Sequence, residues 1–534
     1  MKNIKILLSF LGFTLMMLSC SSESTFHPDY VLTRNADTTM TVNIDANTTY
    51  QTIDGFASSD AWNMDFIGKY WSQNSKDDIA KMLFSQKITN GQPEGIGLSM
   101  WRVNLGGGTA EQGDESGIEQ EERRAECFQN SDGSYNWNKA AGQQYFMQKA
   151  KNYGVKSFVF FSNTPPVFYT KNGKGYSDSK ANSNLKDDCY DKFADFLATT
   201  ALHFKEQGYS ISYISPVNEP QYNWSGGQEG SGWQNSEVVK LVRNLDQSLT
   251  SKGLDSTNIL VDEAGAWNDL YEADATAGNG RSDVMNDFFN PSSSDYIGNL
   301  KHVPALICAH SYWLDTSWDQ LQSTRQKVNA AAKAKNLKVY QTEWSMMSSN
   351  YDLFSNYDNA TPMDLALTLS EVIHADLTQA NVSSWAFWTA CDRERWSQKS
   401  RFFLIRLIPV SGDYGSLTEG GTCESTKNLW VLGNYSLFIR PGYKRVSVSL
   451  PVSGNQFFAS AYISPGKDKL VIVYTNTKTK SVKVDNHISI QGRTTDNPIE
   501  YITTSGSNLQ MVSSYDTTII PSRSVATIIY DLKS

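Results

Sequence analysis

The stretch DCYDKFADFLATTALHFKEQGYSISYISPVNEP, residues 188–220, decides the fold class of this chain of 534 residues. Its first part, 188–208, has apolar side chains three or four positions apart and ends at a glycine. That pattern is typical of an amphipathic helix with its C-terminal cap. Its last part, 211–219, is a short run rich in β-branched and aromatic residues that stops at Pro220, as a buried strand does. A helix that leads directly into such a strand indicates a parallel sheet.

The same alternation continues from about residue 50 to residue 400, and SEVVKLVRNLDQSLTSKG at 236–253 is another helix-like segment that ends at a glycine. The short apolar runs are IDGFA (53–57), GLSMWRVNL (97–105), VKSFVFFSN (155–163), ISYISPVNE (211–219), NILVDEAG (258–265), ALICAHSY (305–312), LKVYQTE (337–343) and SWAFWT (384–389). Eight strands that alternate with helices predict an α/β fold of the (β/α)₈ barrel type. An open doubly wound sheet is the alternative, but no G-x-G-x-x-G opens a helix after the first run.

The sequence changes character after about residue 430. Segments such as RVSVSLP, KLVIVYTN and SVATIIYDL alternate apolar and polar residues, with Gly, Asn, Asp and Ser between them. This pattern predicts an antiparallel β-sandwich over 430–534, following a barrel over 49–429. The early run TMTVNID has the same period, so residues 39–48 are expected to form a strand that joins the sandwich.

The N-terminal segment 1–20 carries targeting signals. Lys2 and Lys5 precede an apolar stretch that is too short to span a bilayer and that ends at Cys20. It resembles a bacterial lipoprotein signal, in which Cys20 receives the lipid; an ordinary secretory signal is the alternative. Residues 21–38 are polar and are expected to be a flexible tether. These features predict an exported protein that is anchored to the cell envelope and meets a membrane only through its lipid.

Charge and composition exclude several classes of partner and cofactor. The net charge of -9 argues against nucleic acid binding, which requires a basic face. We expect no cofactor and no metal, because there is no H-E-x-x-H and no C-x-x-C spacing. Disulfides and buried free thiols both remain open for the five cysteines that follow the signal segment. These are Cys127, Cys189, Cys308, Cys391 and Cys423.

Two glutamates stand at strand ends, where a (β/α)₈ barrel places its active site. Glu219 follows Asn218 at the end of the fourth run, and Glu343 ends the seventh. A single glutamate at such a position is more often a structural ion-pair partner. A pair has a chemical meaning, because glycoside hydrolysis needs two carboxyl groups on either side of the scissile bond.

Five further motifs occur in order along the chain: TYQTIDGFASSDAW (49–62), LSMWRVNLGGG (98–108), VNEPQ (217–221), TEW (342–344) and LGNYSLFIRPGYKRV (432–446). With these motifs the chain resembles glycoside hydrolase family 30, a family of retaining β-glycosidases with a (β/α)₈ barrel. One departure is Ala57, where the family commonly has glycine. The resemblance implies a double displacement with Glu219 as acid/base and Glu343 as nucleophile. It also implies that Asn218 binds the sugar 2-hydroxyl and that Arg102 keeps Glu343 ionised; a structural ion pair is the alternative for Arg102.

Further residues near strand ends are candidates for substrate binding. Tyr312 is expected to hydrogen-bond Glu343. Its strand neighbour His310 is expected either to bind a sugar hydroxyl or to be a core histidine. Trp388 would form the floor under the reacting sugar, since C–H faces of sugars stack on indole rings. Asp60 and Trp62 would bind and stack in the same subsite. Outer subsites are expected from some of Trp101, Trp224, Trp233, Trp267 and Trp313.

The expected partner is a polysaccharide or oligosaccharide substrate, cleaved by a monomeric enzyme. Within the family, the GFASSDAW opening and the SYW after the sixth run look most like the endo-β-1,6-galactanase branch, which points to β-1,6-galactan side chains of arabinogalactan. The alternatives are a β-1,6-glucanase, a glucuronoxylanase or, from another class, a non-catalytic glycan-binding lipoprotein. Loss of one carboxylate would favour the last of these, and both carboxylates are present.

Overall fold

The computed structural model describes residue 36 and residues 38–278, 280–451, 456–496, 498–512 and 519–534. The expected signal segment 1–20, with Cys20, lies outside these residues, as does almost all of the expected tether 21–38. Ala36–Ser534 forms one compact unit. Among the described residues, none of the helices has the length and apolar character needed to cross a bilayer.

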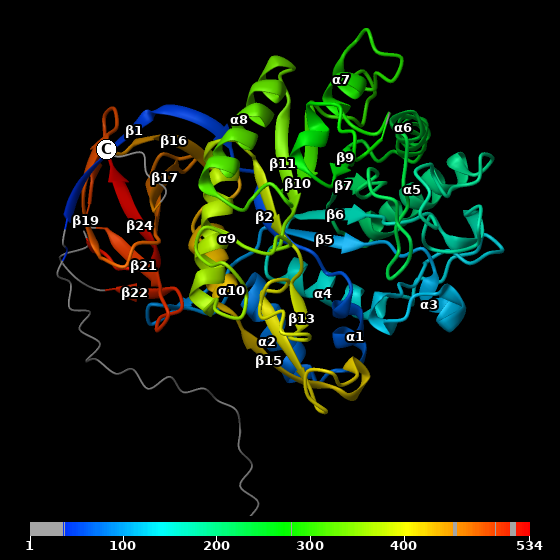
Figure 1. Cartoon of the computed structure of the whole chain (residues 1–534), viewed down its shortest axis with the longest axis horizontal. Coiled ribbons are helices and arrows are strands. Elements are labelled where there is room, and N and C mark those ends of the chain that lie inside the picture. Colours follow the sequence, from blue (N-terminus) through cyan, green and yellow to red (C-terminus); the bar gives the residue numbers. More distant parts are fainter. Residues whose placement is uncertain (1–35, 37, 279, 452–455, 497, 513–518) are drawn as a thin grey trace, which may run out of the picture. The chain divides into compact units, whose positions relative to one another are not determined.

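All eight apolar runs form strands that pair in parallel (Figure 1). One sheet has the order β2-β12-β11-β10-β9 and the other the order β5-β6-β7-β8. The fifth run supplies both β8, which pairs with β7, and β9, which pairs with β10. An isolated parallel bridge between Ser59 and Arg102 lies between the segments of β2 and β5. The strands are β2 (Gly55–Ser58), β5 (Met100–Asn104), β6 (Ser157–Phe161), β7 (Ile211–Ser215), β8 (Asn258–Ile259), β9 (Asp262–Ala264), β10 (Leu306–His310), β11 (Lys338–Glu343) and β12 (Ser384–Phe387).

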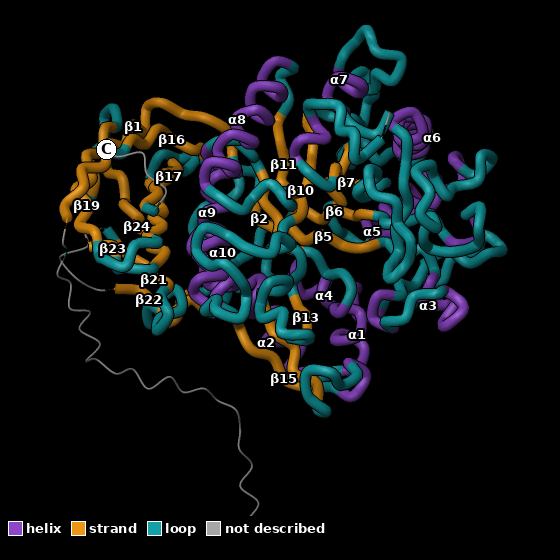
Figure 2. Tube along the Cα trace, in the orientation of Figure 1, coloured by secondary structure: helices purple, strands orange, loops and turns teal. Residues whose placement is uncertain are grey.

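Helices separate these strands along the chain, so the fold is mixed α/β, as predicted. The two helix-like segments identified in the sequence are α5 and α6 (Figure 2). Their apolar positions, such as Phe193 and Leu197 of α5 and Val242 and Leu245 of α6, are buried in the main core with the strands. The helices are α1 (Asn63–Tyr70), α2 (Gln73–Phe84), α3 (Thr109–Gln112), α4 (Ala141–Asn152), α5 (Tyr190–Glu206), α6 (Asn235–Ser251), α7 (Val284–Phe289), α8 (Trp318–Ala334) and α9 (Pro362–Thr378).

Residues 391–436 contain elements that the sequence pattern did not predict. A small sheet of β13 (Cys391–Arg393), β14 (Ile405–Pro409) and β15 (Gly421–Ser425) follows the last parallel strand. Elsewhere, before β5, a two-stranded sheet of β3 (Ile88–Thr89) and β4 (Gln92–Pro93) was likewise not predicted. The boundary expected between residues 429 and 430 falls within α10 (Lys427–Ser436). From Asn428 on, this helix is buried, because it packs against α9 on one side and against C-terminal strands on the other.

The C-terminal strands form one continuous ten-stranded sheet, with the order β22-β21-β24-β18-β17-β16-β1-β19-β23 and β20 beside β24. The N-terminal strand β1 pairs antiparallel with β16 and parallel with β19, so the sheet is not wholly antiparallel. Alternate residues such as Val42, Ile44, Ile472 and Ile528 fill a core of its own. The strands are β1 (Thr38–Thr52), β16 (Lys444–Ser449), β17 (Phe457–Ile463), β18 (Lys469–Asn476), β19 (Val482–Ser489), β20 (Thr494–Thr495), β21 (Ile499–Thr503), β22 (Gln510–Val512), β23 (Ile519–Ile520) and β24 (Ser524–Lys533).

The five cysteines of the described part are free thiols. All of them except Cys423 are buried, so they serve as small apolar core residues.

Candidate active site

A cavity of about 580 Å³ opens where the parallel strands end. Its lining includes residues that directly follow or end four of these strands: Asn218 and Glu219 after β7, Tyr312 after β10, Glu343 of β11 and Trp388 after β12. The chain thus brings together, in one cavity, residues that are up to 170 positions apart in the sequence.

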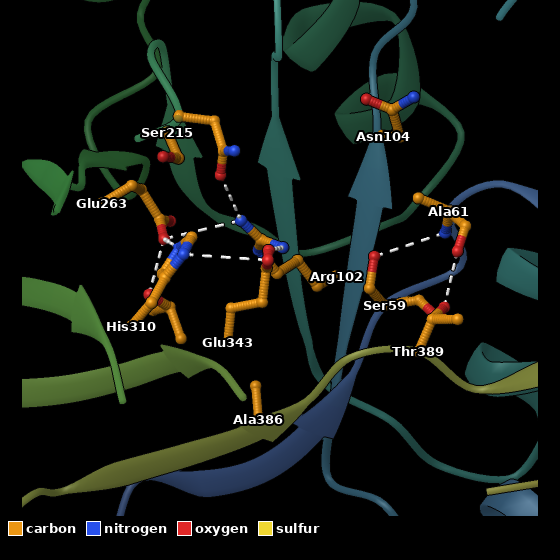
Figure 3. A network of polar contacts seen from close by, with 12 residues as sticks. Ser59, Ala61, Arg102, Asn104, Ser215, Glu263, His310, Glu343, Ala386 and Thr389 are labelled. Carbon is orange, nitrogen blue, oxygen red and sulfur yellow. Dashed lines mark hydrogen bonds and ion pairs between the residues drawn. The ribbon is translucent and has the colours of Figure 1, made fainter. Parts of the chain in front are cut away.

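Glu343 is held by two donors, of which Arg102 is drawn beside it in Figure 3. Arg102 Nη1, from β5, donates to Oε2 at 2.6 Å, and the Tyr312 hydroxyl donates to Oε1 at 2.9 Å. Both contacts were predicted from the sequence. Burial raises the pKa of Glu343, and the positive charges of His310 and Arg102 oppose that shift. The carboxylate is therefore fixed in orientation and faces the cavity.

His310 lies between carboxylates and has no access to solvent. Its Nδ1 is 2.8 Å from Glu219 Oε1, and its Nε2 is 3.0 Å from Glu263 Oε2. Burial alone would lower the pKa of this imidazole, but Glu343, Glu219 and Glu263 together raise it to about 10. The expectation that His310 binds a sugar hydroxyl is wrong, because both ring nitrogens are occupied by protein carboxylates.

The two glutamates predicted from strand ends lie close together. An oxygen of Glu219 and an oxygen of Glu343 are within 4.8 Å of each other. Asn218 lines the cavity beside them, and its Oδ1 accepts a hydrogen bond from Arg102 Nη2 at 3.2 Å. That contact occupies the amide oxygen and leaves the amide N–H groups as donors for a ligand.

Glu263 of β9 is a site residue that the sequence reasoning missed. It is fully buried, accepts a hydrogen bond from Thr342 Oγ1 at 2.5 Å and lies 3.5 Å from Arg102 Nη2. Burial pushes the pKa of Glu263 upward, but Arg102 and His310 outweigh it and hold the pKa at about 2. The available signal was the pair of acids within the apolar run NILVDEAG, since an acid in a buried strand requires a charged partner.

Five tryptophans are part of the cavity lining. Trp388 and Trp62 meet edge to face, with ring centroids 5.1 Å apart, beside the glutamates. Trp224, Trp313 and Trp396 also line it, and Trp313 and Trp396 are 53% and 58% exposed. Trp396 was not singled out from the sequence. The other tryptophans considered for outer subsites are fully buried and contribute to the core: Trp101, Trp233 and Trp267.

Asp60 does not reach the cavity, contrary to expectation. It is fully buried, where Oδ1 accepts from the Asn104 backbone N–H at 2.9 Å and Oδ2 from Gln143 Nε2 at 2.8 Å. Burial raises the pKa of Asp60 to about 7. Its carboxylate thus joins the end of β5 to α4 and does not line the cavity.

Glu219, His310 and Glu343 approach one another within the spacing that a metal ion requires. However, both nitrogens of His310 already face carboxylates, and the Arg102 guanidinium provides positive charge at Glu343. The cluster is thus built as an ion-pair network, in which the cations are side chains.

Comparison with known proteins agrees with this geometry. A family model described as O-glycosyl hydrolase family 30 matches residues 39–399. An endo-β-1,6-galactanase of Hypocrea rufa is 26% identical over 461 residues, 83% of this chain and 81% of that protein. A glucuronoxylanase of Bacillus subtilis is 23% identical over 364 residues, 68% of this chain and 69% of that protein. The crystal structure of a conserved exported protein from Bacteroides fragilis superposes with a TM-score of 0.84 at 33% identity, over 92% of this chain and 100% of that one. Because the family match spans more than half of its length, the chain belongs to glycoside hydrolase family 30 and is a glycosidase.

Proposed function

We propose that the protein is a retaining, endo-acting β-glycosidase of β-1,6-galactan. One observation carries the mechanism: oxygens of Glu219 and Glu343 lie within 4.8 Å of each other in one cavity. Retaining enzymes hold their two carboxyl groups roughly 5–5.5 Å apart, whereas inverting enzymes leave about 6.5–9.5 Å for a water molecule. The spacing here favours direct attack by one carboxylate.

In the first step, Glu343 attacks the anomeric carbon while protonated Glu219 gives its proton to the departing glycosidic oxygen. The carbon–oxygen bond to the leaving group breaks, and an ester to Glu343 forms. In the second step, Glu219 takes a proton from water, whose oxygen displaces Glu343 and restores it as a carboxylate. Arg102 and Tyr312 hold Glu343 in line, and the N–H donors of Asn218 are placed to bind the sugar 2-hydroxyl.

The aromatic lining supports a carbohydrate chain as the substrate. Trp62 and Trp388 provide indole faces next to the reacting carboxylates, and the exposed rings of Trp313 and Trp396 extend this surface outward. A longer aromatic surface suits an enzyme that cleaves within a polysaccharide. The similarity to an endo-β-1,6-galactanase favours β-1,6-galactan. The similarity to glucuronoxylanases keeps glucuronoxylan as an alternative, alongside β-1,6-glucan.

Three structural proposals accompany this function. The parallel strands β2 to β12, joined in sequence by helices, are proposed to close into a (β/α)₈ barrel over residues 49–429. The C-terminal sheet is proposed to fold over its own core as a sandwich that supports the barrel and does not bind sugar; Trp430 is the last tryptophan of the chain. Cys20 is proposed to carry a lipid that anchors an exported, monomeric enzyme to the cell envelope.

The test is product analysis after incubation with β-1,6-galactan, β-1,6-glucan and glucuronoxylan. We expect oligosaccharides of mixed length from β-1,6-galactan and none from the same glycan with Glu343→Gln. Products only from another of these glycans would overturn the substrate but leave the glycosidase mechanism. If wild type and Glu343→Gln bind the glycans equally well and neither releases any product, the protein is the alternative, a non-catalytic glycan-binding lipoprotein.

A further inference from the structure

Glu263 contacts residues that bind Glu219 and residues that bind Glu343, but it does not itself line the cavity. Its side chain approaches His310 Nε2 at 3.0 Å, and its backbone carbonyl accepts a hydrogen bond from the backbone N–H of Glu219 at 2.9 Å. It also lies 3.5 Å from the guanidinium of Arg102, which holds Glu343. Figure 3 shows Glu263, His310, Arg102 and Glu343 close together and joined by dashed lines. One buried carboxylate is thus connected to the catalytic acid and to the nucleophile.

The surrounding charges indicate what this carboxylate does. The titratable and charged groups that face Glu263 and His310 from the neighbouring elements are Arg102 of β5, Glu219 after β7, Asp262 of β9, Cys308 and Tyr312 on and after β10, and Glu343 of β11. Burial raises the pKa values of Asp262, Cys308 and Tyr312 well above their usual ranges, so burial favours the neutral form of each of these groups.

The net charge of this cluster is then zero when Glu219 is protonated. Arg102 and His310 are positive, and Glu263 and Glu343 are negative, so the cluster is neutral with a proton on Glu219. Without Glu263, the same cluster would carry an uncompensated positive charge. That charge would favour loss of the proton from both Glu219 and Glu343, because a nearby positive charge stabilises a carboxylate.

We infer that Glu263 is a positioning residue that orients His310 toward Glu219 and balances the positive charge of His310, and that it thereby sets the pH range in which Glu219 is protonated while Glu343 is ionised. It acts through His310 and Arg102 and does not contact substrate. The inference rests on the proposed roles of Glu219 and Glu343.

The test is the pH profile of kcat/KM for Glu263→Gln, measured on the glycan that the wild type cleaves. The substitution keeps the shape and removes the charge. We expect both limbs of the profile to move to lower pH, by on the order of one unit, because removing a nearby negative charge favours the ionised form of the remaining carboxyl groups. Activity at the wild-type optimum should fall with this displacement and recover in part at lower pH.

A matched control is the neighbouring residue, Asp262→Asn. Asp262 is equally buried, but it accepts a hydrogen bond from Gln221 Nε2 at 2.6 Å, and burial raises its pKa well above the usual range. The two limbs of the Asp262→Asn profile should therefore stay at their wild-type pH. If Glu263→Gln does not fold, Glu263→Asp retains the negative charge but moves it away from His310 Nε2, which Glu263 approaches at 3.0 Å. A smaller shift in the same direction is then expected.

Limbs that stay in place while kcat falls would reduce Glu263 to a purely structural role and overturn the inference. Limbs that move to higher pH would overturn the charge balance. Failure of the proposed function looks different: Glu219→Gln or Glu343→Gln would then retain wild-type activity. If both of these are inactive and the Glu263→Gln limbs do not move, only the inference about Glu263 fails.

Discussion

At the scale of single residues, Tyr312 offers a direct measure of how strongly Glu343 must be held. Its hydroxyl donates to Glu343 Oε1 at 2.9 Å, and Tyr312→Phe removes that donor with little change in shape. A hydrogen bond to a charged group contributes about 1.5–3 kcal/mol, so we expect kcat/KM to fall roughly ten- to hundredfold. Steady-state kinetics on the cleaved glycan measure this. A variant with the wild-type rate would show that Arg102 alone orients the nucleophile.

The meeting of Glu219 and Glu343 in one cavity could be predicted from the sequence because each glutamate ends a clearly bounded apolar run. Asp60 follows the first run and His310 lies near the end of the sixth, but the sequence does not show which way a side chain turns at a strand end. Asp60 turns toward Gln143, and His310 lies between two carboxylates. Glu263 was missed because it lies within an apolar run and not at its end. Its partners Arg102, His310 and Thr342 are on other strands, far away in the sequence.

At the scale of elements, Arg281 fixes the segment that carries Glu219 after β7. Its guanidinium donates to the carbonyl of Pro220 and, at 3.3 Å, to that of Trp233, and it contacts Asn223 Oδ1 at 2.5 Å. Lysine cannot reproduce this fork of donors. We expect Arg281→Lys to lower kcat by more than tenfold with a smaller change in KM, since the acid loses its placement and the indole platforms remain.

The control for that variant is Arg243→Lys, on the exposed face of α6, where the guanidinium donates to the backbone carbonyls of Ser294 and Tyr296. Its kinetics should match the wild type. Equal kinetics for both variants would show that the segment after β7 keeps its conformation without Arg281.

Helix α9 carries a pH-dependent element of stability. Glu371 is buried there, and burial raises its pKa from 4.5 to about 8. The folded state therefore takes up a proton, so the contribution of Glu371 to stability decreases as pH rises from about 4.5 to about 8. We expect Glu371→Gln to become more stable relative to wild type between pH 5 and pH 8, by on the order of 1–4 kcal/mol. Urea unfolding at the two pH values measures this; a pH-independent difference would contradict it.

Elements with a clear period could be predicted, and those without one could not. The helices α5 and α6 follow an apolar spacing of three to four residues, and the parallel strands are continuous apolar runs. The strands β13 to β15 are short and partly polar, so no period marks them. Helix α10 lies across the expected domain boundary. It could not be predicted because it is buried on both sides and has no polar face to give an amphipathic pattern.

At the scale of the whole molecule, the C-terminal sheet and the preceding α/β part depend on each other. Strand β24 lies between β18 and β21, and Thr527 within it donates to the Asn434 carbonyl of α10 at 2.7 Å. Deleting residues 521–534 would expose two strand edges and the buried helix. We expect this truncation to yield no soluble enzyme, whereas removal of Ser534 alone, which follows the strand, should leave the melting temperature unchanged. A soluble, active truncation would show that the sheet is dispensable.

The central claim, that Glu343 forms a covalent intermediate with the sugar, is tested most directly by the anomeric configuration of the first product. Proton NMR during cleavage of the preferred β-linked glycan distinguishes the two anomers before they interconvert. The geometry of Glu219 and Glu343 predicts that the β-anomer is formed first, since two displacements at the anomeric carbon retain its configuration. Initial formation of the α-anomer would contradict the mechanism.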